Sequence, residues 1–86
     1  MYNIQIVKYE TEVFFTLNAD TINPKFNGPI EGVIDIEEPN VYYCTVCDYW
    51  PDYAPINKEF QTMSDAEKFV TAQINKIADR IKETIK

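Results

Sequence analysis

The chain has 86 residues, of which 45% are apolar and 14% aromatic, and its formal charge is −6. This length allows a single domain over residues 1–86, and the composition is typical of a folded protein rather than a disordered tail. The negative charge argues against direct binding to nucleic acid or to an anionic membrane surface, because both depend on Lys and Arg.

The charge is unevenly distributed along the chain. Residues 1–57 hold nine acidic residues against Lys8 and Lys25, a balance of −7, whereas residues 58–86 hold five acidic against six basic residues, a balance of +1. No Lys or Arg lies between Lys25 and Lys58, a stretch that is also rich in tyrosine. A protein surface normally mixes both signs of charge, so the sequence divides into an acidic part and a balanced C-terminal part.

No segment has the roughly 20 consecutive apolar residues of a membrane span. The first residues also lack the charged start and apolar run of a secretion signal. We therefore expect a cytoplasmic location, which is the host-cell cytoplasm if a phage encodes the chain. Cys44 and Cys47 are then expected to be reduced.

The first half of the chain predicts a hairpin and a long connection. Apolar and polar residues alternate over 2–6 and again over 13–17, on either side of a polar turn at 10–12, which predicts two antiparallel strands. Residues 18–31 contain Asn, Asp, two prolines and a glycine and predict an irregular connection. Connections of this length are often functional.

The second half predicts another hairpin and a helix. Residues 32–37 and 41–50 read as strands joined by a turn around Pro39, and Pro51 favours a type I turn over 50–53. Ser64 and Glu67 match a capping box. Apolar residues then recur every three or four positions over 64–85, which predicts an amphipathic helix. The expected fold is α+β: a four-stranded antiparallel sheet of two hairpins with one C-terminal helix packed on one face, in the order ββββα.

Strand alternation assigns side chains to the two faces of that sheet. The face toward the helix is expected to hold Ile4, Ile6, Val13, Phe15, Leu17, Ile34 and Ile36, which meet the helix residues Ala66, Val70, Ile74, Ile77, Ile81 and Ile85. The opposite face is expected to hold Val7, Tyr9, Phe14, Val33, Tyr43 and Tyr49. That face is more apolar than a solvated surface requires, so either it binds a protein or the connection 18–31 covers it.

The residue types exclude several kinds of chemistry. The chain has no His, one serine and two glycines, so His-based catalysis, His metal ligation and glycine-rich phosphate loops are excluded. Cys44 and Cys47 form a C-x-x-C pair on a strand and should point to opposite faces, which favours core packing over intermolecular zinc or disulfide chemistry. Asp35 and Glu37 lack the surrounding ligand loop of a calcium site. We expect no catalytic residue, no metal, no cofactor and no enzymatic activity.

The candidate binding residues are acidic and tyrosine side chains from the middle of the chain: Asp35, Glu37, Glu38, Tyr43, Asp48, Tyr49, Asp52 and Tyr53. Tyrosine is a common interface anchor, and carboxylates pair with Arg or Lys on a partner. Trp50, in the same segment, is expected to pack in the core.

These residues favour a non-enzymatic protein-binding domain whose partner is a protein with a basic surface. Its specific form is an inhibitor of a nucleic-acid-acting enzyme, of the phage, mobile-element, immunity or antitoxin type, in which carboxylates take the place of phosphates. The alternative is a structural or assembly protein that forms a homodimer through its aromatic sheet face. A third, weaker hypothesis is a regulatory domain that binds a small cationic or aromatic ligand between sheet and loop.

Overall fold

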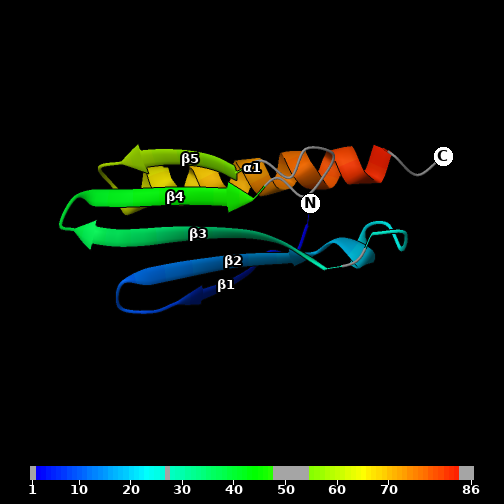
Figure 1. Ribbon diagram of the computed structural model, residues 1–86, viewed down its shortest axis with the longest axis horizontal. Helices are drawn as coiled ribbons and strands as arrows, with labels where there is room; N and C mark the ends of the chain where they lie inside the picture. The colour runs from blue at the N-terminus through cyan, green and yellow to red at the C-terminus, as the bar shows by residue number, and fades with distance from the viewer. Residues whose placement is uncertain (1, 27, 48–54, 84–86) are drawn as a thin grey trace.

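The computed structural model describes residues 2–26, 28–47 and 55–83. Its elements are β1 (Gln5–Lys8), β2 (Glu12–Asn18), the 3-10 helix η1 (Ala19–Thr21), β3 (Pro29–Glu38), β4 (Val41–Cys47), β5 (Pro55–Phe60) and α1 (Met63–Glu83). The strands form one antiparallel sheet in the order β1-β2-β3-β4-β5, and α1 packs on one face of it (Figure 1). The predicted α+β fold is confirmed, with five strands instead of four.

The fifth strand, β5, lies at an edge of the sheet, and its whole length pairs with residues 42–47 of β4. Its sequence runs through Asn57, Lys58 and Glu59, so it has no apolar alternation to reveal it. Charged residues such as Lys58 are typical of edge strands, where they discourage pairing with another chain. Pro55 occupies its first position, where a missing N–H is tolerated.

The first strand begins later than predicted. Residues 2–4 leave the sheet and turn toward the helix, where the Tyr2 hydroxyl donates a hydrogen bond to Asp79 Oδ1 at 2.7 Å. Strand β3 begins at Pro29, three residues earlier than expected, so the connection before it is shorter. The predicted end of β4 at 48–50, the turn at 50–53 and Trp50 lie outside the described residues.

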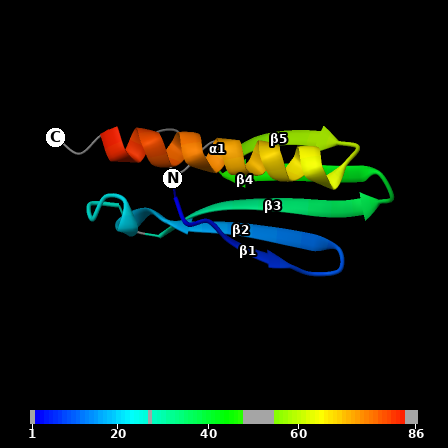
Figure 2. The same ribbon diagram turned by 180° about the vertical axis from the view of Figure 1, so that it is seen from behind.

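The core lies between the sheet and α1 (Figure 2). Val13, Phe15, Leu17 and Ile34 are buried in it as predicted. Ile6, on the edge strand β1, is 46% exposed because α1 lies mainly over β3 and β4. Ile4 and Ile36 are only partly buried. The core also contains Ala19, Ile30, Cys44 and Val46, and it takes Ala66, Val70, Ile74, Ile77, Ala78 and Ile81 from the helix. Ile85 lies outside the described residues.

Close approach of α1 to β3 depends on Gly32. A Cβ atom placed at this glycine would lie 2.5 Å from Cγ1 of Val70. Such a contact would force the Val70 side chain, the helix or the strand to move. The missing side chain therefore sets the distance between the two layers.

The connection between β2 and β3 closes one end of the core. Ile22 and Phe26 pack against the core cluster, and Asn23 is 1% exposed. The connection lies at the end of the sheet beside the last turns of α1 (Figure 1). Of the two alternatives for the opposite sheet face, the structure does not show coverage by the described part of this connection, because its apolar residues pack in the core.

The helix has its N-cap two residues earlier than the capping box predicted. Its first residue is Met63, and the backbone N–H of Asp65 donates to Oγ1 of Thr62 at 3.2 Å. Thr62, and not Ser64, is therefore the N-cap residue. Among the described residues, no helix combines the length and the apolar character that crossing a membrane requires.

Candidate functional site

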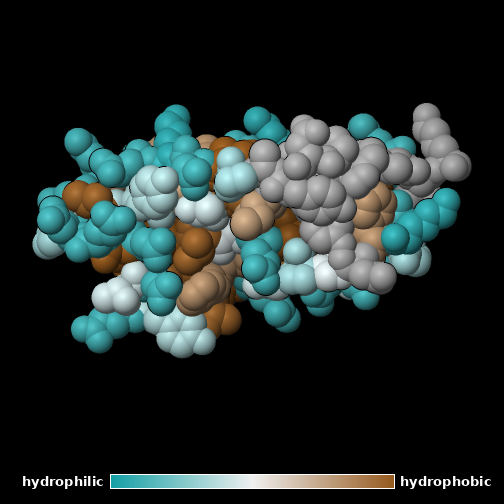
Figure 3. Space-filling model, viewed as in Figure 1, coloured by the Kyte–Doolittle hydropathy of each residue, from teal (hydrophilic) through white to brown (hydrophobic). Residues whose placement is uncertain are grey.

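The sheet face that points away from α1, called the open face below, carries an apolar patch. Val7, Phe14 and Val33 lie opposite one another across β1, β2 and β3. Tyr9 packs edge-on against Phe14, with ring centroids 5.6 Å apart. Val7, Tyr9 and Phe14 are 48%, 61% and 39% exposed, respectively. Exposed apolar surface adjoins polar surface on this side of the molecule (Figure 3).

An acidic row crosses the open face beside this patch. The strand register aligns Glu12, Asp35, Tyr43 and Glu59 on β2, β3, β4 and β5. Neighbouring strands are about 4.8 Å apart, so the row extends over roughly 14 Å. Glu31, opposite Thr16, lies on the other side of Val33. The apolar patch thus has carboxylates on both sides, an arrangement common at protein interfaces, which have an apolar centre and a polar rim.

Both basic residues of the described strands point to the helix side of the sheet. Lys8 lies opposite the buried Val13, and its Nζ is 3.9 Å from Oε1 of Glu67. Lys58 lies opposite the buried Cys44, with its Nζ 5.3 Å from the centre of the Phe60 ring. Within the described strands, the open face therefore has no basic side chain.

The structure brings together only part of the predicted binding residues. Asp35 and Tyr43 are direct neighbours across β3 and β4. Glu37 and Glu38 lie at a β-bulge near the end of β3, where Glu38 is opposite Val41. Asp48, Tyr49, Asp52 and Tyr53 lie outside the described residues.

Sequence reasoning missed three acidic residues of the open face: Glu12, Glu31 and Glu59. The signal for Glu12 was available, because the alternation that places Phe14 on this face also places Glu12 there. Glu31 and Glu59 required the correct start of β3 and the existence of β5, respectively. Neither could be inferred from apolar periodicity.

The two cysteines point to opposite faces of β4, as predicted. Cys44 is buried and its Sγ donates to the carbonyl of Ala66 at 3.8 Å, whereas Cys47 is exposed. Burial raises the pKa of the Cys44 thiol from 9.0 to about 11. Core packing is therefore correct for Cys44 and wrong for Cys47. In the described part of the chain, no group of three His, Cys, Asp or Glu side chains is placed to hold a metal ion.

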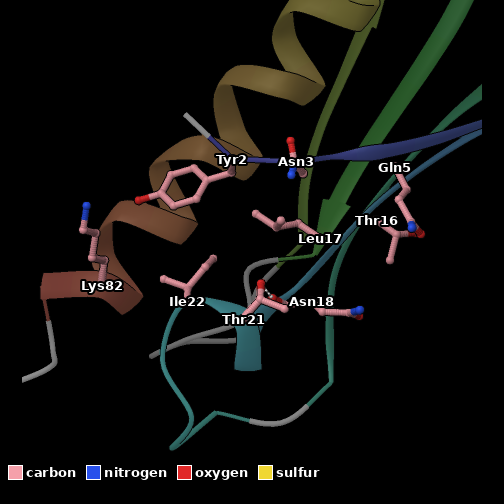
Figure 4. A pocket seen from close by; sticks show the side chains of 9 residues that line it. All are labelled: Tyr2, Asn3, Gln5, Thr16, Leu17, Asn18, Thr21, Ile22 and Lys82. Atoms are coloured by element: carbon pink, nitrogen blue, oxygen red, sulfur yellow. Dashed lines mark hydrogen bonds between the residues drawn. The ribbon is translucent and has the colours of Figure 1, made fainter.

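A separate hollow of about 590 Å³ lies between the N-terminal segment, β2, η1 and the end of α1 (Figure 4). It is lined by Tyr2, Asn3, Gln5, Thr16, Leu17, Asn18, Thr21, Ile22 and Lys82. The hydrogen bond to Asp79, with a smaller contribution from burial, raises the pKa of Tyr2 to about 12. The same hydrogen bond orients the Tyr2 ring along this hollow.

Comparison with known protein families gives no match, and neither curated proteins nor solved structures give one. The function of this chain therefore has to be argued from its surfaces.

Proposed function

We propose that this chain is a non-enzymatic domain that binds a basic protein surface through its open face. The observation that supports this most directly is that Lys8 and Lys58 both point to the helix side of the sheet. In the described strands, the open face therefore has carboxylates and no basic side chain. Arg and Lys side chains of a partner would meet the row Glu12, Asp35 and Glu59, while its apolar side chains would cover Val7 and Phe14.

The specific form of the proposal is an inhibitor that occupies the basic groove of a nucleic-acid-acting enzyme. Arg binds carboxylate and phosphate with the same fork of N–H donors, so a row of carboxylates can compete for a phosphate-binding surface. Tyr43 lies between Asp35 and Glu59 in this row. Its ring offers a guanidinium group a stacking surface beside the two carboxylates.

The alternative, a homodimer formed through the open face, is less favoured by the same charges. Two copies placed face to face would bring their acidic rows together without an intervening base. Like charges across an interface cost several kcal/mol. Sedimentation equilibrium at low and high salt distinguishes the two, because a face-to-face homodimer would strengthen as salt screens this repulsion.

The test uses two triple variants with the same change in net charge. Glu12→Gln, Asp35→Asn and Glu59→Gln neutralise the acidic row, whereas Asp20→Asn, Asp65→Asn and Glu83→Gln neutralise acids in η1 and on α1. Each protein is added to a panel of nucleases and polymerases that act on labelled duplex DNA, and inhibition is measured over a salt series.

We expect the first triple variant to lose inhibition by about tenfold or more, since each ion pair contributes up to about 1 kcal/mol. The second triple variant should inhibit like the parent chain, and inhibition should weaken as salt rises. Equal losses in both variants, or inhibition that is insensitive to salt, would contradict a role for the open face. If no enzyme of the panel responds, the inhibitor form of the proposal fails.

A further inference from the structure

The hollow exists because β1 ends before β2 does. The last pair between the two strands joins Gln5 to Thr16, whereas β2 continues to Asn18. The chain before Gln5 is drawn away toward α1 by the bond between Tyr2 and Asp79. The final residues of β2 therefore have no neighbouring strand on that side, and the space beside them is open (Figure 4).

A backbone donor points into this space. The N–H of Tyr9 donates to the carbonyl of Glu12, and the N–H of Ala19 donates to the carbonyl of Gly28. Along an antiparallel strand, the backbone N–H and C=O groups of successive residues point to opposite neighbouring strands. In β2, the backbone groups of the even-numbered residues therefore point toward β1, and those of the odd-numbered residues point toward β3. The N–H of Asn18 thus points to where β1 would continue, and no described backbone group pairs with it. Its carbonyl accepts from Oγ1 of Thr21 at 2.7 Å.

The side chains around this donor are neutral and polar, with one positive charge. Asn3, Gln5, Thr16 and Asn18 make no side-chain hydrogen bond to any described residue, so their donors and acceptors are available. Leu17, Ile22 and the ring of Tyr2 supply the apolar part of the lining. Lys82 is the one charged residue of the lining, although the chain has 14 acidic residues.

We propose that this hollow binds a small hydroxylated carboxylate of the sugar-acid class. The carboxylate would pair with Lys82, hydroxyl groups would exchange hydrogen bonds with Asn3, Gln5 and the Asn18 N–H, and the apolar ring face would lie against Tyr2 and Ile22. The volume of about 590 Å³ is in the usual range for small-ligand sites. A cationic ligand, by contrast, would meet Lys82, whereas the Asp79 carboxylate beside the hollow already accepts a hydrogen bond from Tyr2.

The experiment is a titration of the whole chain with glucuronate, followed by amide NMR spectra and compared with glucose and acetate. We expect saturable shifts of the Asn18 backbone amide and the Asn3 and Gln5 side-chain amides, with glucuronate binding more tightly than either comparison compound. Lys82→Gln should weaken glucuronate about fivefold, as expected for one exposed ion pair, and leave glucose unchanged. Lys76→Gln, on the same helix but outside the hollow, is the matched control and should bind like the parent chain.

The proposal would be overturned if the Asn18 amide showed no saturable shift with glucuronate up to about 10 mM, which is ten times a weak dissociation constant of about 1 mM. Equal binding of glucuronate and glucose would also overturn it. So would equal effects of Lys82→Gln and Lys76→Gln on glucuronate binding. The site is independent of the proposed function. The triple variant Glu12→Gln, Asp35→Asn and Glu59→Gln should therefore still bind glucuronate, so the two proposals can fail separately.

Discussion

The side-chain amide of Asn23 donates a hydrogen bond to the backbone carbonyl of Ile81 at 3.3 Å, joining the connection after β2 to the last turn of α1. The Oδ1 atom of the same residue accepts from the N–H of Lys25 at 3.1 Å. The last carbonyls of a helix have no partner within the helix. Asn23 supplies one of these partners from inside the core, where water cannot.

Replacing Asn23 with Ala should lower the free energy of unfolding by about 1–3 kcal/mol, because the Ile81 carbonyl would stay buried without a donor. Asn23→Asp keeps the acceptor for Lys25 and removes the donor, so it isolates the bond to the helix and should also destabilise. Urea unfolding monitored by circular dichroism measures both. Unchanged midpoints would show that the bond contributes nothing to stability.

Gly32→Ala should destabilise the domain by about 1–3 kcal/mol, since the new methyl group would overlap Val70. The double variant Gly32→Ala with Val70→Ala provides the control, because shortening Val70 removes the overlap. We expect the double variant to be less destabilised than the sum of the two single variants in thermal unfolding. Strict additivity would mean that the two residues do not interact.

The two candidate N-caps of α1 can be separated by substitution. Thr62→Ala should cost about 1 kcal/mol, the usual loss for an N-cap residue, because the Asp65 N–H loses its acceptor. Ser64→Ala should change the free energy of unfolding much less, since Ser64 already lies inside the helix. If Ser64→Ala lowered the free energy of unfolding more than Thr62→Ala in chemical denaturation, the capping box predicted from sequence would be supported instead.

The two thiols should differ in reactivity. At pH 8, a thiol reagent such as 5,5′-dithiobis(2-nitrobenzoate) should modify exposed Cys47 rapidly and buried Cys44 only after unfolding, and Cys47→Ala should abolish the fast phase.

The folded-state pKa of Cys44 is raised from 9.0 to about 11, so its neutral thiol stabilises the fold fully below pH 9. That contribution should disappear as pH rises through 11. Cys44→Ala should therefore flatten the alkaline decline in stability, and an unchanged decline would contradict burial of the thiol.

Apolar periodicity was sufficient to predict most of the architecture. Phe15 and Ile34 alternate with polar neighbours, and the helix stripe from Ala66 to Ile81 repeats every three or four residues, so both layers and their contact could be predicted. Strand β5 could not be recognised, because the run from Asn57 to Glu59 shows no such pattern.

The remaining differences depend on tertiary contacts. The role of Asn23 arises from a helix turn 58 residues away in the sequence. Ile6 alternates like a core residue, and its exposure follows from where α1 lies on the sheet. The acidic row combines Glu12, Asp35 and Glu59 from three strands, so its composition depended on the register and on a strand that the sequence did not reveal.

The orientation of Lys8 and Lys58 gives the domain an electric dipole moment across its two layers. The helix carries four acidic and four basic residues and is electrically balanced, whereas the opposite side of the sheet is negative. In the electric field of a positively charged molecule, the domain therefore rotates before contact so that its negative side faces that molecule. The charge distribution should then accelerate encounter in one orientation, independently of the close contacts that set the lifetime of a complex.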